Sequence, residues 1–505
     1  MPDLPLQCSV HLATLQADLD ARIKSLGKSA PGIAQSRAIV EAALEDGDSH
    51  YGINTGFGAL ASKRISPTQV AELQRNLLIS HACGVGEPVP RDITRLMLQL
   101  KIHALSQGYS GISEETFALL LRFAELDLLP YIPSRGSVGA SGDLAPLAHL
   151  ALPLIGEGEF WDQNGKPTPA AGVLAAAGLA PVQLQAKDGL ALINGTQLMA
   201  AYGAYVLAKT RTLVKTADIL AAMSLEALQG SIKPFDARIH AIRPHPGQQR
   251  VAGNIRILLV DSEILESHRH CGKVQDPYSL RCVPQVHGAS RDALEHATKV
   301  LETEINAVTD NPLVFPDGDV ISGGNFHGQP LALVLDFAAM ALAELGSISE
   351  RRSYLLLEGH DGLPKLLMQD TGVNSGFMIP QYAAAALVSE NKVLCHPACV
   401  DSIPTSLGQE DHVSMGSISA LKLLQVLHNV EHVLAVEMCT AAQALDYRAP
   451  RKPGRGVAIA HKTLRAHLAH NEQDYQVRRD LDQCRDLIRA HALTDAVQAE
   501  MGALA

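Results

Sequence analysis

The chain has 505 residues, and its 42 Lys and Arg against 53 Asp and Glu give a net charge of −11. Nucleic-acid-binding proteins concentrate basic charge, so this balance argues against that class of protein. With 47% hydrophobic and 19% charged residues, the chain can bury a large core and is not expected to be disordered.

The sequence predicts neither export nor membrane insertion. Its first residues, MPDLPLQCSVHL, lack the basic region and apolar run of a secretory signal. The most apolar long stretch, 331–345, carries Asp336 and Glu344, so we expect no membrane span. The cysteines are scattered without a C-x-x-C pair, and the one dense His and Cys cluster, 268–271, lacks the spacing of zinc ligands. We therefore expect a cytoplasmic protein with reduced thiols and no metal.

The elements that the sequence predicts are mostly long helices. In chain order they are a hairpin at 160–165, a helix at 294–308, a second hairpin at 314–318, and helices at 331–345 and 415–446. Each hairpin places apolar residues before an Asn-Gly or Asp-Gly turn. Each helix has apolar residues at steps of three or four, which gives it one buried face.

These helices indicate a mainly α protein built around a bundle. We expect an N-terminal region of mixed structure over 1–215, a central long-helix bundle over 216–447 and a C-terminal helical segment over 448–505, which together form one interwoven body. The basic residues of 448–456 are interpreted as part of a solvated loop rather than as an anion site.

The segments between the helices carry the candidate chemistry. Tyr51–Gly58 has three glycines among polar and aromatic residues, which predicts a loop with special backbone angles. Gln275–Arg281 sets a phenol and a guanidinium three residues apart, and arginine is the natural bidentate partner of a carboxylate. Gln409–His412 sets two carboxylates and a histidine before the longest helix, as a helix cap or as acid–base groups. Asn194–Thr196 and Asn325–His327 are further candidates.

The segment Gly136–Pro146 allows three interpretations. A phosphate loop would need a lysine that the segment lacks. A serine-hydrolase elbow would fit Gly139–Ser141, but Asp143 stands where its last glycine belongs. In the third interpretation the nitrogen of Gly142 attacks the carbonyl of Ala140, and the loss of two waters leaves an alkene that is a strong electrophile. The residues alone favour a simple structural turn over this cyclisation.

Together, these segments resemble the motifs of the aromatic amino-acid ammonia-lyase family. The resemblance reverses the preference at Ala140, Ser141 and Gly142: it implies that they cyclise to methylidene-imidazolone (MIO), so that no external cofactor is needed. An electrophile is required because ammonia must leave while a β-proton of low acidity is removed. The similar stretches follow the family's order through nearly the whole chain: YGINTGFG (51–58), GSVGASGDLAPLAH (136–149), GLALINGTQ (189–197), VQDPYSLRC (274–282), TDNP (309–312), GGNFHG (323–328), VNSGFM (373–378) and QEDHVSM (409–415).

The resemblance also implies a fold and an assembly. The family's fold is mainly α, a long-helix bundle of the ammonia-lyase/fumarase-like type with a mixed N-terminal catalytic region and a few short strands. Its members are homotetramers whose active sites draw residues from several subunits. We expect the partner of this chain to be a small-molecule substrate, and neither nucleic acid nor a membrane.

Roles of single residues follow from the resemblance, position by position. Tyr51 is expected to remove the β-proton, for which a phenol needs a lowered pKa. Arg281 would hold the carboxylate of the substrate. Asn194 and Tyr278 would orient the MIO group and the substrate amine.

Substrate choice is expected to depend on His81 and Glu410, which resemble the histidine-acting members of the family. A histidine and a carboxylate can pair with both nitrogens of an imidazole, and such a pocket should reject a phenyl ring because its polar groups would stay unmatched. Phe326 would line the ring pocket, and Gln275 would act behind the contact residues. We therefore predict conversion of L-histidine to trans-urocanate and ammonia, the first step of histidine degradation.

Other functions remain open at this point. Within the family, the alternatives are an ammonia-lyase that acts on tyrosine or phenylalanine and an MIO-dependent histidine aminomutase. From other classes of protein, the alternatives are a serine hydrolase with Ser141 as its nucleophile and a non-enzymatic helical assembly protein.

Overall fold

The computed structural model describes residues 10–27, 30–46, 48–269 and 272–505. Within these residues the elements are α-helices, short 3₁₀ helices and small antiparallel strand pairs. The prediction of a mainly α protein with a few short strands is therefore confirmed. Cys8 and part of the 268–271 cluster lie outside the described residues.

The chain divides into two compact units, and each unit combines segments that are distant in the sequence. The three consecutive regions expected from the sequence remain a proposal about how the chain is organised. Unit 1 comprises Met1–Ala208, Thr298–Asp336 and Pro397–Leu421, and unit 2 comprises Lys209–Ala297, Phe337–His396 and Lys422–Ala505.

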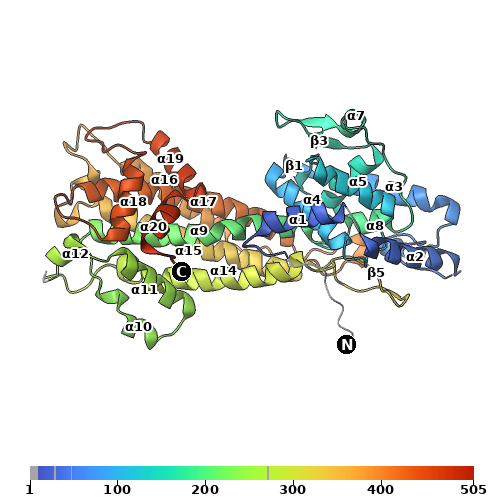
Figure 1. Ribbon diagram of the computed structural model, residues 1–505, viewed down its shortest axis with the longest axis horizontal. Helices are drawn as coiled ribbons and strands as arrows, with labels where there is room; N and C mark the ends of the chain where they lie inside the picture. Colours follow the sequence, from blue (N-terminus) through green and yellow to red (C-terminus); the bar gives the residue numbers. More distant parts are fainter. Residues whose placement is uncertain (1–9, 28–29, 47, 270–271) are drawn as a thin grey trace. The chain divides into compact units, whose positions relative to one another are not determined.

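Unit 1 contains the N-terminal helices and the strand pairs (Figure 1). Its helices are α1 (Leu15–Leu26), α2 (Pro31–Glu45), α3 (Val70–His81), α4 (Arg91–Leu105), α5 (Glu114–Glu125), α6 (Leu144–Ala151), α7 (Ala170–Ala176) and α8 (Asp188–Ile193). Its antiparallel pairs are β1 (Val85–Pro88) with β2 (Pro133–Arg135), β3 (Glu159–Trp161) with β4 (Pro167–Pro169), and β5 (Leu313–Val314) with β6 (Val320–Ile321).

Two groups of helices build this unit. α4 is its centre, since every residue from Leu96 to Leu105 is buried, and α1 and α5 pack against it. α3, α6 and α8 pack on one another as a second group. The loops that connect the second group carry the glycine-rich motifs of the sequence.

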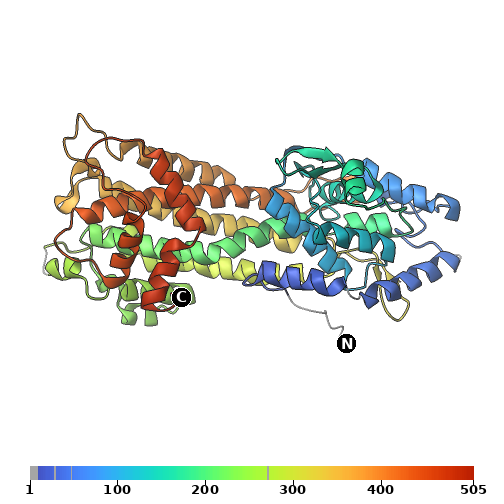
Figure 2. The same ribbon diagram turned by 45° about the horizontal axis from the view of Figure 1, so that its top comes forward.

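Unit 2 is built around long helices that are divided between the two units. In both views their unit 2 parts run alongside one another as a bundle (Figures 1 and 2). These helices are α9 (Gln197–Ala227), α14 (Val283–Ile305), α15 (Gln329–Leu357) and α17 (Gly416–Asp446). The shorter helices are α10 (Ala237–Ala241), α11 (Pro246–Leu258), α12 (Glu263–Ser267), α13 (Tyr278–Arg281), α16 (Met378–Leu394), α18 (Arg455–Arg465), α19 (Arg478–Arg489) and α20 (Ala492–Met501).

Buried charges join the long helices of unit 2. Arg352 of α15 and Glu437 of α17 form an ion pair without solvent exposure, with 2.8 Å between Nη2 and Oε2. His287 of α14 lies 2.8 Å from Asp218 of α9, again without solvent exposure. Since a buried charge that loses its partner is costly, these pairs fix which helix faces meet.

The predicted hairpins and long helices are present, with changed bounds. The helix expected over 415–446 is α17, and the one expected over 331–345 lies inside the longer α15. The helix expected over 294–308 is α14, which begins at Val283 and ends at Ile305. Its first half buries His287 and Arg291 instead of an apolar stripe, so apolar periodicity did not reveal it.

The basic segment 448–456 is only partly a solvated loop. Arg451, Lys452 and Arg455 are exposed, but Arg448 is 7% exposed, so the interpretation was wrong for this residue. The Nε of Arg448 donates a hydrogen bond of 2.7 Å to the carbonyl of Ala227. Ala227 is the last residue of α9, where a carbonyl has no partner within its own helix.

Among the described helices, α15 is long and apolar enough to cross a membrane by length and composition alone. Of its most apolar stretch, 67% is buried inside the protein. The core helices of soluble proteins have the same property, so α15 is weak evidence for a membrane span.

Candidate active site

Unit 1 contains a cavity of about 1120 Å³. Its wall is formed by the loop after α2, the second half of α3, the loop before α6, the C-terminal end of α8, and parts of 311–327 and 406–412. The cavity therefore collects side chains from segments that are far apart in the sequence. Of the expected site residues, those that line it are Tyr51, His81, Ala140, Ser141, Asn194, Phe326 and Glu410.

Gln275, Tyr278 and Arg281 belong to unit 2 and are not among the residues that line this cavity. Gln275 is exposed, and so is Tyr278, to 70%. The guanidinium carbon of Arg281 lies 4.4 Å from the centre of the Tyr278 ring, and Nε donates a hydrogen bond of 3.0 Å to the carbonyl of Asp276. The phenol and the guanidinium are thus neighbours in space as well as in sequence.

The loop before α6 packs its backbone against Gly195, on both its N–H and its carbonyl. The N–H of Asp143 donates to the carbonyl of Gly195 over 2.7 Å, and the N–H of Gly195 donates to the carbonyl of Ser141 over 3.4 Å. Gly142 has a φ of +73°, and a Cβ there would lie 2.0 Å from the oxygen of Gly195. The third residue of the tripeptide must therefore be glycine.

Asp143 joins this loop to the first turn of α9. Its Oδ2 accepts hydrogen bonds from the N–H groups of Leu198 (3.0 Å) and Met199 (3.1 Å). Complete burial raises the pKa of Asp143 to about 7, although these hydrogen bonds oppose the rise. α6 begins at the next residue, Leu144. The tripeptide therefore lies beside the N-terminal ends of two helices, which carry partial positive charge.

Glu410 contacts the tripeptide directly. Its Oε1 accepts a hydrogen bond of 3.1 Å from Oγ of Ser141, and its Oε2 accepts one of 2.6 Å from Oγ1 of Thr405. α17 begins only at Gly416, so Glu410 does not cap that helix. Both oxygens of the carboxylate are held, one of them against the hydroxyl of the tripeptide.

Tyr51 and His81 line the cavity with shifted pKa values. Burial raises the pKa of Tyr51 and the nearby carboxylates of Glu410 and Asp310 raise it further, while the N–H of Gly58, 3.3 Å from the phenol oxygen, opposes the rise. Burial lowers the pKa of His81, and Glu410 opposes the fall. Tyr51 thus favours the protonated phenol and His81 the neutral imidazole. The pKa of Tyr51 is therefore raised, and not lowered as expected.

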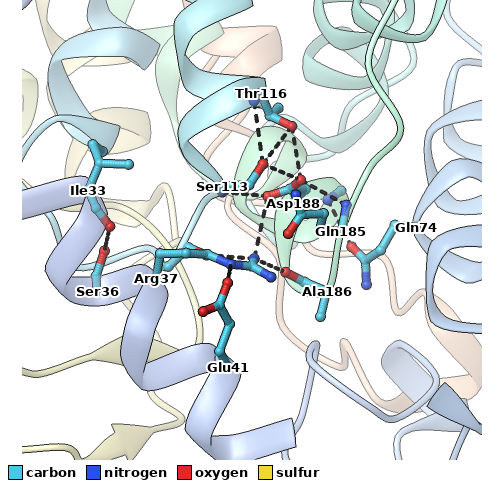
Figure 3. Close-up of polar contacts among 12 residues, drawn as sticks. Ile33, Ser36, Arg37, Glu41, Gln74, Ser113, Thr116, Gln185, Ala186 and Asp188 are labelled. Atoms are coloured by element: carbon cyan, nitrogen blue, oxygen red, sulfur yellow. Dashed lines mark hydrogen bonds and ion pairs between the residues drawn. The ribbon is translucent and has the colours of Figure 1, made fainter.

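α8 is anchored at its N-terminal end by the buried Asp188, which Figure 3 shows among its polar contacts. Asp188 accepts hydrogen bonds from the N–H and Oγ of Ser113 (2.7 Å each), from Oγ1 of Thr116 (2.9 Å) and from the N–H of Gln185 (2.9 Å). The guanidinium of Arg37 adds an ion pair at 3.9 Å. These contacts fix α8, and with it the residue that follows its C-terminal end.

That residue is Asn194, which leaves one acceptor unpaired at the cavity wall. Its Nδ2 donates to Oδ1 of Asp310 over 3.2 Å and to the carbonyl of Asn311 over 3.1 Å. No described residue donates a hydrogen bond to its Oδ1. Because buried polar atoms are nearly always paired, this oxygen is a candidate for contact with a bound group.

Aromatic side chains complete the wall. Phe326 is half-buried, and the rings of His327 and His412 stack at 5.9 Å. Over the described ranges, no three His, Cys, Asp or Glu side chains are arranged to hold a metal ion.

Sequence reasoning missed the residues that support the site from behind. Asp310 lies in the TDNP motif, but no role was assigned to it. Lys101 had a visible signal, since it is a charge inside the apolar run LMLQLKIHAL. Thr405 and Gln74 are ordinary loop and helix residues in the sequence, and only their contacts reveal them.

The chain is similar along nearly its whole length to known proteins. The model of one family, aromatic amino acid lyase, matches residues 10–466. Histidine ammonia-lyase of Myxococcus xanthus is 50% identical over 98% of this chain and 96% of its own length. The crystal structure of histidine ammonia-lyase from Trypanosoma cruzi is 42% identical, with a TM-score of 0.87 over 97% of this chain and 94% of that one. Tyrosine aminomutase from Streptomyces globisporus is 34% identical, with a TM-score of 0.88 over 97% of both chains.

We expect Gly142→Ala to destabilise the protein more than Gly178→Ala. Both glycines have positive φ, +73° and +68°, so both changes carry the cost of a left-handed residue, about 1–2 kcal/mol. Only the Cβ at 142 would also collide with a backbone oxygen, since the space around Gly178 is open. Thermal unfolding of both variants measures the difference. Equal unfolding temperatures would show that the two backbones do not approach closely.

Proposed function

Because the chain belongs to the aromatic amino acid lyase family, we propose that it is a carbon–nitrogen lyase that converts L-histidine to trans-urocanate and ammonia. The observation that carries this proposal is the presence of Glu410 and His81 in one cavity with Ala140 and Ser141. Relatives and a structural neighbour named histidine ammonia-lyase support the choice of substrate. A serine hydrolase is not supported, since the chain belongs to a family of lyases.

We propose that Ala140, Ser141 and Gly142 form MIO. The residues around them fit this group. Position 142 admits only glycine, and the hydroxyl of Ser141 is hydrogen-bonded to Glu410. The N–H of Gly195 donates a hydrogen bond to the carbonyl of Ser141, which the ring would retain. When formed, the group supplies an electrophilic carbon at the cavity wall. It is made from the chain itself, so the proposal includes no external cofactor.

His81 and Glu410 are proposed to bind the imidazole of the substrate. His81 favours its neutral form, which can accept or donate one hydrogen bond, and Glu410 offers a carboxylate oxygen at the tripeptide. Phe326 would pack beside the ring. A phenyl ring would leave the two polar groups unmatched in a partly buried pocket, which disfavours phenylalanine.

Tyr51 and Asn194 are proposed to act at the α- and β-carbons. Tyr51 would take the β-proton, for which its raised pKa must fall. The ammonium group of a bound substrate lowers the pKa of a nearby phenol, because an opposite charge favours the ionised form. Asn194 would accept a hydrogen bond from the amine with its unpaired Oδ1.

Arg281, Tyr278 and Gln275 are proposed to serve the site through a homotetramer with active sites shared between subunits. Arg281 would pair with the substrate carboxylate, Tyr278 would orient the amine, and Gln275 would support both. In unit 2, large apolar side chains are exposed on α15 and α16, which is typical of surfaces that another subunit covers. They include Phe337 (44%), Tyr354 (43%), Ile379 (59%), Tyr382 (59%) and Val393 (73%).

A second function in the same family is the conversion of L-histidine to β-histidine by an aminomutase. The similarity to tyrosine aminomutase, at 34% identity and nearly full coverage, motivates it. The greater identity to histidine ammonia-lyases favours the lyase. For either enzyme we propose a cytoplasmic location, consistent with cysteines that are scattered along the sequence without a C-x-x-C pair.

Incubation of the purified protein with L-histidine should give urocanate absorbance and an equal amount of free ammonia. L-tyrosine and L-phenylalanine, supplied at the same concentration, should react far more slowly because their rings cannot pair with His81 and Glu410. Formation of β-histidine without ammonia would support the aminomutase. No reaction with histidine, together with turnover of tyrosine, would contradict the proposed substrate.

Glu410→Gln should lose about 100-fold of the activity on L-histidine, the scale of losing a hydrogen bond to a charged group that binds the imidazole. The matched control is Glu159→Gln, an exposed residue on β3, which should stay within about twofold of the parent by the small effect of surface changes. Steady-state urocanate production measures both variants. Small and equal losses would show that the charge of Glu410 is not used in the reaction.

A further inference from the structure

A buried lysine lies behind the cavity. Lys101 of α4 is 2% exposed, and its Nζ donates a hydrogen bond of 2.8 Å to the backbone carbonyl of Asn194. Burial lowers the pKa of Lys101 to about 7, while the carboxylate of Asp310 opposes the fall. The lysine is therefore costly to bury as a cation in this position.

A second buried cation holds the side chain of the same asparagine through an aspartate. Nζ of Lys187, the residue before α8, lies 2.8 Å from Oδ2 of Asp310, and these side chains are 0% and 3% exposed. The other oxygen of Asp310 accepts the hydrogen bond from Nδ2 of Asn194. Asn194 is thus held at its backbone by Lys101 and at its side chain by Asp310.

These contacts set the atoms that meet the tripeptide and the cavity. Asp310 occupies Nδ2 of Asn194, so Oδ1 is the side-chain atom left unpaired. The carbonyl that Lys101 binds belongs to the peptide whose N–H, that of Gly195, donates to Ser141. A cation on the carbonyl polarises the peptide and strengthens its N–H as a donor, since hydrogen bonds in a chain reinforce one another.

We propose that Lys101 is a positioning residue for the reaction, which fixes the peptide between Asn194 and Gly195 against the tripeptide. The inference rests on the proposed function. A role in stability alone does not explain the lysine, because burying the ammonium group of this residue, which is 2% exposed, costs free energy that an apolar side chain would not. A methionine of similar length would fill the same space without the cost of burying a charge.

The test compares Lys101→Met with Gln99→Met. Gln99 lies on the same helix and is 5% exposed, but its amide contacts Asp20 (2.9 Å) and Gln16 (3.2 Å) instead of the site. For each variant, kcat and KM for L-histidine, the thermal unfolding temperature and the intact mass are measured. The intact mass gives the fraction of chains that have lost two waters.

For Lys101→Met we expect kcat, counted per chain that has lost two waters, to fall about 10- to 100-fold, the effect of misplacing a reacting group by about 1 Å. KM should change less than kcat. Gln99→Met should keep kcat within about twofold of the parent, because residues that do not contact the reacting groups have small effects. A kcat per cyclised chain equal to that of the parent would overturn the proposal. So would an equal loss in Gln99→Met.

A crystal structure of the unsubstituted protein gives a second readout, which is decisive even if Lys101→Met does not fold. Nζ of Lys101 within about 3.2 Å of the carbonyl oxygen of Asn194 supports the proposal. An ammonium group turned away from that carbonyl overturns it. Failure of the proposed function would give a different result from failure of this inference. In that case the unsubstituted protein itself would release no urocanate.

Discussion

The carbonyl group of Gly195 lies so close to the backbone of Gly142 that no side chain fits between them. Two short segments, one before α6 and one after α8, are joined there by hydrogen bonds between Asp143 and Gly195 and between Gly195 and Ser141. A glycine nitrogen at a tight turn, with its neighbours held on both sides, is what closure of a five-membered ring requires. The other features of the site serve to hold this contact in place or to line the space in front of it.

The support behind the contact is polar and buried, and the space in front of it is partly open. Asp188 anchors α8, Lys101 and Asp310 hold Asn194, and Thr405 holds Glu410. Such networks carry a desolvation cost that an apolar core would avoid, so they are best explained by the precise placement of groups that contact a ligand. In the proposed function, the polar groups at the cavity wall would select a ring that can match them.

The fold and the site were predictable to different depths. Of the long helices, α14, α15 and α17 followed from apolar periodicity, whereas α9 was not predicted. α14 begins earlier than expected because its first half buries His287 and Arg291 instead of apolar residues. The lining residues followed from motif resemblance, which names positions but not their surroundings. The raised pKa of Tyr51 and the hydrogen bond of Lys101 depend on burial and on partners 93 or more residues away, so no local pattern contains them. The same holds for Arg448. The sequence shows only a basic loop, and the hydrogen bond of Arg448 to the last carbonyl of α9 becomes visible only in the structure.

The intact mass of the purified protein tests the central claim most directly. If Ala140, Ser141 and Gly142 form the electrophile, the mass is lower than the sequence mass by two waters. The Ser141→Ala variant should then have the mass calculated from its own sequence and should produce no urocanate. The sequence mass in a preparation that actively releases ammonia from L-histidine would contradict the account. The close approach of the two backbones would then serve only to shape the cavity.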